Sequence, residues 1–361
     1  MRRALARVDL GAIERNCARL AATVAPAVLC AVVKAEGYGH GAAQAARAAQ
    51  AGGARWLAVA TAGEADALRA GGLEGPLLVM GALTEVELDV ALAAGADVVA
   101  WEEDFVAAVA ARGGGAVHVK LDTGMGRLGT RDPAQADRVA AAVAAADGLR
   151  LAGAMTHLAT ADDDDAFVHE QLAAFRPWAA ALADRHPGLL VHAANSAAAL
   201  RQPGARFGMV RCGIAIYGMD PFHRDPADHG LEPALELVSY LAAVKRAEPG
   251  QSAGYGRRFV ADRETWIGTI PIGYGDGVRR GLTNNADVLV GGRRVPLVGT
   301  VSMDNITVDL GDEPVETGTE AVLIGARGGE RILAEDVAAR LGTINYEVTC
   351  GISSRVPREY T

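Results

Sequence analysis

Short apolar runs alternate with alanine-rich, charged stretches between residues 27 and about 220. The intervening stretches, such as GAAQAARAAQAGG, place alanine and charge at helical spacing and end on glycine, which is typical of helices. The apolar runs have the length of buried strands and cover residues 27–34, 56–62, 76–82, 96–101, 116–121, 151–158, 188–194 and 208–217. Strands that alternate with helices in this way predict an α/β fold, an N-terminal (β/α)8 TIM-like barrel. Strand counting leaves a doubly wound sheet open as the alternative.

The pattern changes after about residue 235. Segments such as TWIGTIPIGYGDG and ADVLVGGRRVPLVGTVSMDNITVDL are rich in β-forming residues and are separated by glycine and proline turns. One helical pattern, residues 333–341, interrupts them. We therefore expect a barrel domain over residues 1–235 and a mainly β C-terminal domain over residues 236–361. The segment 1–10 precedes the first barrel strand and is able to pair with the second domain as an extra strand.

The composition narrows the class of protein. The 35 basic and 44 acidic residues give a net charge of −9, and no basic tract is present that would neutralise the phosphates of a nucleic acid. The longest apolar runs have about ten residues, too few to cross a bilayer, and the N-terminal MRRALARVDL lacks the apolar core of a secretory signal. The four cysteines are widely spaced and form no CxxC pair, so we expect reduced thiols and a cytoplasmic protein.

Lysine is rare in this chain and falls at informative positions. Of the 35 basic residues, only Lys34, Lys120 and Lys245 are lysines. Unlike arginine, lysine can lose its proton and act as a nucleophilic amine. In a barrel the carboxyl ends of the strands carry the chemistry. Seven polar residues fall at or just after such ends, with Gly213 close to the last of them: Lys34, Lys120, Asp122, His157, Asn195, Ser196 and Arg211. Their convergence predicts an active site at one mouth of the barrel.

The residues after the seventh and eighth strands predict a phosphate site. Barrels commonly bind phosphate there through backbone N–H groups and small hydroxyls, and Ser196 with the Gly213–Ile214 backbone fits such a cradle. A phosphate site and a nucleophilic lysine in one mouth point to a phosphorylated aldehyde held as a Schiff base, for which pyridoxal 5'-phosphate is the obvious candidate. Metal chemistry is the weaker alternative, because no pair of histidines or cysteines has ligand spacing.

Nine motifs, in order along essentially the whole chain, resemble those of the alanine racemases. They are AVVKAEGYGHG, KLDTGMGRLG, THLATAD, HAANSAA, MVRCGIAIYG, AGYGRRF, PIGYGDG, VSMDNITVD and INYEVTCGISSRVPR. The resemblance implies a pyridoxal-phosphate enzyme that interconverts L-alanine and D-alanine by two-base proton transfer at Cα and supplies D-alanine for peptidoglycan. It also implies a head-to-tail homodimer with shared active sites.

The resemblance assigns roles to the residues that would bind the cofactor. Lys34 would carry the cofactor as an aldimine and, once freed by substrate, act as one base at Cα. Tyr38 and Ser196, with the backbone of Gly213 and Ile214, would hold the phosphate.

The resemblance also assigns the residues around the substrate. Arg211 would face the pyridine nitrogen, which would stay unprotonated because a guanidinium does not give up its proton. Tyr255 of the partner subunit would be the second base, with His157 hydrogen-bonded to it and Arg211 behind. Arg127 would bind the substrate carboxylate, aided by the backbone of Met303 from the other chain.

Three positions bear on modification and specificity. Lys120 stands where members of the family often carry a carbamylated lysine, N6-carboxylysine, which would position Arg127. Ser354 stands where many members have a tyrosine that touches the cofactor phosphate and narrows the entrance, and Thr300 stands where some members have an arginine at the entrance corridor. These two departures leave a broader or serine-preferring racemase of the same fold as the alternative.

Two other classes of protein remain as rivals. Fold-related decarboxylases use an acidic residue at the position of Arg211, so this arginine disfavours them. A non-catalytic pyridoxal-phosphate carrier uses a similar lone barrel, but it lacks the β domain and the motif that contains Tyr255.

Overall fold

The computed structural model describes residues 2–361, which divide into two compact units. The barrel unit comprises Ile13–Phe222 and Ala227–Glu232. The β unit comprises the chain up to Ala12, His223–Pro226 and Pro233–Thr361.

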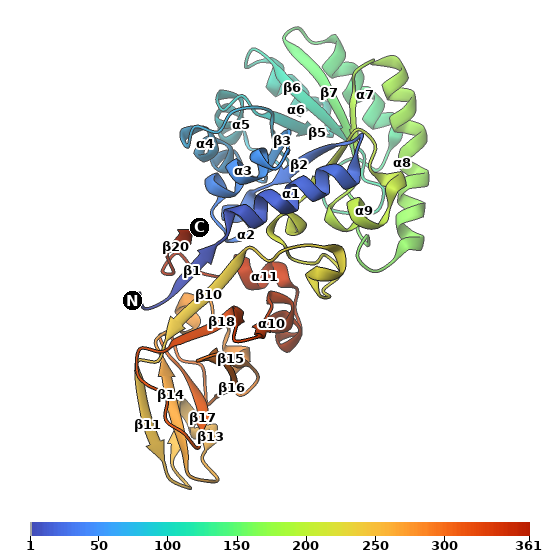
Figure 1. The fold of residues 1–361 in the computed structure, drawn as a ribbon. Coiled ribbons are helices and arrows are strands. Elements are labelled where there is room, and N and C mark those ends of the chain that lie inside the picture. The colour runs from blue at the N-terminus through green and yellow to red at the C-terminus, as the bar shows by residue number, and fades with distance from the viewer. Residues whose placement is uncertain (1) are drawn as a thin grey trace. The chain divides into compact units, whose positions relative to one another are not determined.

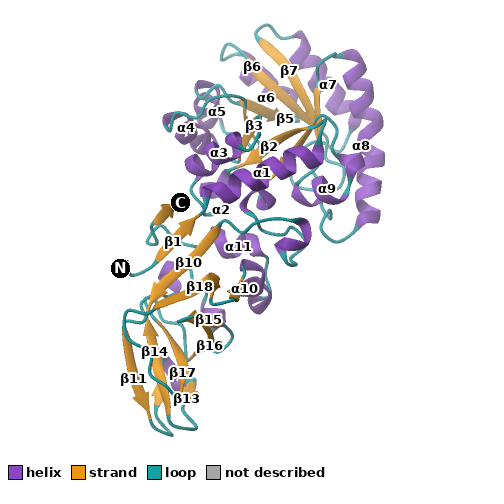
Figure 2. Cartoon of the chain, in the orientation of Figure 1, coloured by secondary structure: helices purple, strands orange, loops and turns teal. Residues whose placement is uncertain are grey.

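The barrel unit is built on a closed barrel of parallel strands, which Figure 2 shows in orange within a surround of purple helices. The strands are β2 (Val28–Val32), β3 (Trp56–Val59), β4 (Leu77–Val79), β5 (Asp97–Ala100), β6 (Gly115–Lys120), β7 (Leu149–Met155), β8 (Leu190–His192) and β9 (Met209–Cys212). The predicted barrel is confirmed, and the doubly wound alternative is wrong because β9 pairs with β2, with Arg211 opposite Cys30. Apart from β6, the strands are shorter than the apolar runs that predicted them.

Helices alternate with the barrel strands along the chain, and the first of them precedes β2 (Figure 1). They are α1 (Leu10–Val24), α3 (Ala42–Ala51), α4 (Ala62–Ala70), α5 (Glu85–Ala93), α6 (Glu103–Ala110), α7 (Pro133–Ala145), α8 (Asp165–Arg185) and α9 (Ser196–Arg201). Capping boxes begin α4 at Thr61 and α5 at Thr84, which satisfies backbone N–H groups that would lack partners. Within residues 2–361, no helix combines the length and the apolar character needed to span a membrane.

The β unit contains a ten-stranded sheet in the order β11-β14-β17-β16-β15-β18-β10-β1-β20, with β19 paired to β18. The strands are β1 (Leu5–Val8), β10 (Leu235–Tyr240), β11 (Ala243–Ala247), β14 (Thr265–Ile270), β15 (Asp287–Val290), β16 (Arg293–Val298), β17 (Ile306–Gly311), β18 (Glu320–Arg327), β19 (Glu330–Ile332) and β20 (Arg358–Tyr360). A separate ribbon joins β12 (Ser252–Ala253) to β13 (Phe259–Val260), and the helices are α10 (Ala334–Leu341) and α11 (Asn345–Cys350).

The first strand of the chain belongs to the sheet of the β unit. β1 pairs antiparallel with β10, with Leu5 opposite Val238, and parallel with β20. Leu5 and Val238 are buried in one apolar cluster with Leu289 and Val322. Apolar burial therefore fixes the N-terminal segment in this sheet.

Candidate active site

Lys34 begins a left-handed turn directly after the first barrel strand. The strand ends at Val32, two residues earlier than the sequence predicted, and Lys34 opens α2 (Lys34–Tyr38). Ala35, Glu36 and Tyr38 have φ values of 51°, 54° and 54°, which disfavour every residue with a side chain. The backbone N–H of Ala35 donates to Glu64 Oε1 at 2.6 Å and helps to hold this turn.

We expect the left-handed backbone at Glu36 to lower the stability of the protein. The side chain of Glu36 is exposed, so a substitution there measures the effect of backbone conformation rather than of packing. A left-handed residue with a side chain costs roughly 1–2 kcal/mol, and glycine costs roughly 0.5–1 kcal/mol of extra chain entropy. Glu36→Gly should thus raise the free energy of unfolding by about 0.5–1 kcal/mol, measured by urea denaturation. The matched change Glu14→Gly, at an exposed position in right-handed α1, should lower it. Equal effects of the two changes would contradict the assignment of strain.

The turn brings Tyr38 against Gly213, next to Ser196. The hydroxyl of Ser196 accepts from the backbone N–H of Gly213 at 3.0 Å and of Ala215 at 3.4 Å. A Cβ on Gly213 would lie 2.3 Å from the hydroxyl oxygen of Tyr38, so only glycine leaves room for both. Ile214 follows as the first residue of a short 3₁₀ turn. Hydroxyls and N–H groups thus converge behind β9, as a phosphate cradle requires.

Arg211 is a buried cation at the barrel mouth. Its guanidinium donates to Nδ1 of His192 at 2.6 Å, to Nδ1 of His157 at 3.2 Å, and to the carbonyl oxygens of Thr156 at 2.8 Å and Ala193 at 3.1 Å. Burial lowers the pKa of Arg211 to about 10, so the side chain remains charged at neutral pH.

His157 is held neutral beside this cation. Burial, together with the positive charge of Arg211, lowers the pKa of His157 well below its usual value. Because Arg211 can only donate, Nδ1 of His157 must accept and the proton must lie on Nε2. The imidazole therefore has one N–H group left to donate to another molecule.

Lys120 lies at the end of β6, buried beneath the loop that carries Arg127. Burial and the charges of Arg211 and Arg127 lower the pKa of Lys120 to about 8. Asp122 shapes the loop, since its carboxylate accepts from the backbone N–H of Gly124 at 3.1 Å and of Gly126 at 3.0 Å. Arg127 itself is exposed on this loop.

Tyr255 and Met303 lie on loops of the β unit, where their side chains are 74% and 51% exposed. The hydroxyl of Thr300 donates to the backbone carbonyl of Tyr255 at 2.7 Å. Thr300 is itself buried, so it supports the turn that carries Tyr255. Exposed aromatic and thioether side chains on supported loops are available to a second molecule.

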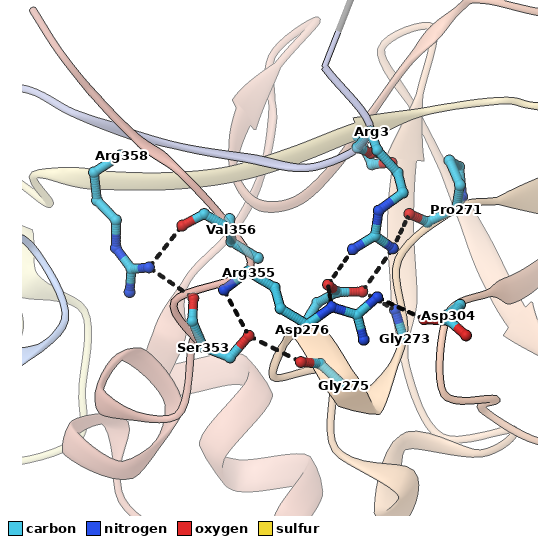
Figure 3. Close-up of polar contacts among 11 residues, drawn as sticks. Arg3, Pro271, Gly273, Gly275, Asp276, Asp304, Ser353, Arg355, Val356 and Arg358 are labelled. Carbon is cyan, nitrogen blue, oxygen red and sulfur yellow. Dashed lines mark hydrogen bonds and ion pairs between the residues drawn. The ribbon is translucent and has the colours of Figure 1, made fainter.

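A network of charges ties the segment of Met303 to that of Ser354 (Figure 3). Arg355, the residue after Ser354, forms an ion pair with Asp304 at 2.6 Å and lies 3.5 Å from the buried carboxylate of Asp276. Asp276 also binds Arg3 and accepts from the backbone N–H of Gly273 at 2.9 Å. These contacts join the two segments within the β unit.

The predicted site residues thus fall into two sets. The barrel unit brings together Lys34, Tyr38, Lys120, Arg127, His157, Ser196, Arg211, Gly213 and Ile214, whereas the β unit carries Tyr255, Met303 and Ser354. Sequence reasoning missed the supporting residues Asp97, His118, His192, Asp276 and Arg355. A polar residue inside an apolar strand, as in AVHVK, is the sequence feature that would have found the two histidines.

Both units match models of one protein family. Residues 8–221 match the alanine racemase N-terminal domain and residues 234–360 the alanine racemase C-terminal domain. Alanine racemase of Thermobifida fusca is 45% identical over 99% of this chain and 97% of its own, and alanine racemase 1 of Bacillus subtilis is 41% identical over 98% and 92%.

Solved structures agree with the sequence relatives. The alanine racemase of E. faecalis superposes with a TM-score of 0.94 at 36% identity, covering 100% of this chain and 98% of that one. The alanine racemase of Streptomyces coelicolor A3(2) gives 0.93 at 39% identity, covering 99% and 97%. The chain therefore belongs to the alanine racemase family, whose enzymes interconvert L-alanine and D-alanine.

Proposed function

We propose that the barrel unit binds pyridoxal 5'-phosphate, with Lys34 as the covalent attachment point and Tyr38, Ser196, Gly213 and Ile214 as the phosphate cradle. The observation that carries this proposal is the close approach of the Tyr38 hydroxyl to Gly213, where a Cβ would lie only 2.3 Å from the hydroxyl oxygen. The hydroxyl of Ser196 is held at this place by the backbone N–H groups of Gly213 and Ala215, which donate to it. When bound, the cofactor withdraws electrons from Cα of the substrate and so acidifies its C–H bond.

The two proton-transfer groups would approach Cα from opposite faces. The amine of Lys34 would take and return the proton on one face, and the phenol of Tyr255 of the partner subunit on the other. His157 would donate its Nε2 proton to the phenolic oxygen, because Arg211 already occupies its Nδ1. Arg211 would hold the ring nitrogen of the cofactor, where a group that only donates can bind without transferring a proton.

The exposure of Tyr255 supports the proposal that the protein works as a homodimer with shared active sites. A tyrosine that serves as a base needs a protected partner surface, and Tyr255 is 74% exposed on the turn supported by Thr300. Met303, which would contribute its backbone to substrate binding together with Arg127, is also exposed. Ser354 would lie beside the cofactor phosphate of the neighbouring site.

The direct test is racemisation of single enantiomers by the purified protein, followed by chiral chromatography. We expect L-alanine and D-alanine to be interconverted and to reach equal amounts, with cofactor absorbance lost when Lys34 is replaced. Carbon dioxide release from alanine in place of racemisation would support the decarboxylase alternative and contradict the proposal.

The burial of Lys120 near two arginines supports the proposal that it is carbamylated. An amine must be neutral to react with carbon dioxide, and a pKa of about 8 makes a fraction of Lys120 neutral near pH 7. The resulting carboxylate would replace a repelled cation between Arg211 and Arg127 by an anion. In 13C-bicarbonate, a carbamate NMR resonance should strengthen as the pH rises toward about 8. Lys120→Gln should abolish this resonance and Lys245→Gln should keep it; the reverse result would refute the assignment.

Ser354 is the position at which alanine specificity can be tested. The relatives do not favour the serine-preferring alternative, since they are named alanine racemases. We expect alanine to remain the best substrate and serine to be turned over slowly, because one small group in a pocket discriminates by about 1–3 kcal/mol. Ser354→Tyr should lower kcat/KM for L-serine more than for L-alanine. An unchanged or higher ratio of serine to alanine turnover would mean that other residues close the pocket.

A further inference from the structure

A continuous chain of hydrogen bonds runs through the core of the barrel from Arg211 to Asp97. Arg211 on β9 donates to Nδ1 of His192 on β8 at 2.6 Å. The other ring nitrogen of His192, Nε2, lies 2.8 Å from Nδ1 of His118 on β6. Nε2 of His118 lies 3.1 Å from Oδ2 of Asp97, the first residue of β5. All four residues are buried.

The direction of every bond in this chain is fixed by its first member. A guanidinium has no acceptor, so Nδ1 of His192 must accept and Nε2 must carry the proton. Nε2 of His192 then donates to His118, whose own proton must lie on Nε2 and point to Asp97. Both imidazoles are therefore neutral and have the same tautomer, and Asp97 is the final acceptor.

The neighbouring strand leaves room for this arrangement. A Cβ on Gly153 of β7 would lie 2.2 Å from Nδ1 of His118, so a glycine is required beside the two imidazoles. The rings of His118 and His192 meet edge to face at 5.0 Å, and Trp56 packs edge-on against His118 at 5.7 Å. Polar groups in a barrel core are costly unless they are fully hydrogen-bonded, and here each ring nitrogen has a partner.

The hydrogen-bond chain also connects Arg211 to the negative charge of Asp97. Within residues 2–361, none of the hydrogen bonds of Arg211 goes to a carboxylate; its acceptors are two imidazoles and two carbonyl oxygens. A buried cation is ordinarily paired with an anion. Asp97 is the anion to which Arg211 is linked, through the polarised imidazoles of His192 and His118. Asp97 has one further cation nearby, Arg150, whose side chain is 66% exposed and lies 3.6 Å away.

We infer that Asp97, His118 and His192 are positioning residues that orient Arg211 toward the barrel mouth. Asp97, the first residue of β5, supplies the counter-charge of Arg211. This inference rests on the proposed function only in giving Arg211 a role at the cofactor ring. The three residues touch neither substrate nor cofactor. They act through Arg211, so their loss affects the rate of the proton transfers more than the binding of alanine.

The test compares two variants. Asp97→Asn keeps a hydrogen-bond acceptor and removes the negative charge, whereas Arg150→Gln removes the exposed cation beside Asp97 and leaves the hydrogen-bond chain intact. Imidazole 15N NMR of the full-length protein reports the tautomers of His118 and His192, and the cofactor-loaded enzyme gives kcat and KM for alanine. We expect Nε2–H tautomers for both rings in the wild type. In Asp97→Asn, the N–H resonance of His192 should shift although His192 does not contact Asp97, because hydrogen-bonded chains polarise one another.

The kinetic result completes the comparison. Asp97→Asn should lower kcat by about 10-fold, the scale of one lost interaction with a charged group, with KM unchanged. Arg150→Gln should match the wild type in NMR and in kcat. A proton on Nδ1 of either ring in the wild type overturns the inference without any variant, and an unchanged kcat in Asp97→Asn overturns it as well. A wild type that does not racemise alanine would refute the proposed function. The tautomers of His118 and His192 would still show whether the hydrogen-bond chain from Arg211 to Asp97 exists.

Discussion

Lys34→Ala is expected to remove the covalent attachment of the cofactor and to lower racemisation by about a thousandfold or more, because it would delete the proposed attachment point and one of the two proposed bases. The other lysines cannot substitute: Lys120 is buried beneath the loop of Arg127, and Lys245 is exposed on β11 of the other unit. The measurement is alanine racemisation, together with the absorbance of the protein-bound cofactor after desalting.

The matched control for this change is Lys245→Ala, which should leave both the absorbance and the rate at wild-type values. Borohydride reduction of the wild type, followed by peptide mapping, identifies the attached lysine independently of any variant. A label on the peptide that contains Lys120 or Lys245 would show that the assignment to Lys34 is wrong.

The barrel strands could be predicted because parallel strands are buried on both faces and appear as continuous apolar runs. The residues at which the strands end were less predictable. The first strand stops at Val32 because the backbone enters the left-handed turn at Ala35 and Glu36, and neither residue type favours that conformation. The contact that helps to hold the turn comes from Glu64, a residue on α4. Such tertiary contacts leave no local pattern in the sequence.

Helix α11 illustrates a second limit. Its six residues, NYEVTC, include β-branched Val348 and Thr349 and follow no apolar period long enough to identify a helix. Asn345 at its first position is buried and donates to Glu335 at 2.8 Å, so packing rather than propensity sets the element. Packing against the rest of the β unit is a property of the fold that the local sequence does not carry.

The site was predictable where residue type limits the chemistry. A lysine just after the first strand, and a serine and a glycine after the last two strands, pointed to a cofactor site, and the structure joins Tyr38, Ser196 and Gly213. The contact between His118 and His192 was not predictable. These residues are 74 positions apart, and each alone resembles an ordinary core histidine. Only the closure of the barrel shows that they meet.

Mixing two inactive variants is expected to restore activity if each site takes Lys34 from one subunit and Tyr255 from the other. Lys34→Ala and Tyr255→Phe should each be nearly inactive as homodimers. In a heterodimer, one site keeps both residues and the other loses both. Random exchange makes about half of the dimers heterodimers with one complete site each, so we expect about one quarter of the wild-type activity. The measurement is alanine racemisation before and after denaturant-assisted subunit exchange.

The control mixes Lys34→Ala with Arg127→Leu. Both residues lie on the barrel unit, so every site of a heterodimer lacks one of them and no activity should return. Exposed Arg127 is replaceable without disturbing the core, which keeps the control folded. If verified heterodimers of Lys34→Ala and Tyr255→Phe stay inactive, Lys34 and Tyr255 serve one site within a single chain. The exposed side chains of Tyr255 and Met303 would then need a different explanation, because a base contributed by the same chain requires no partner surface.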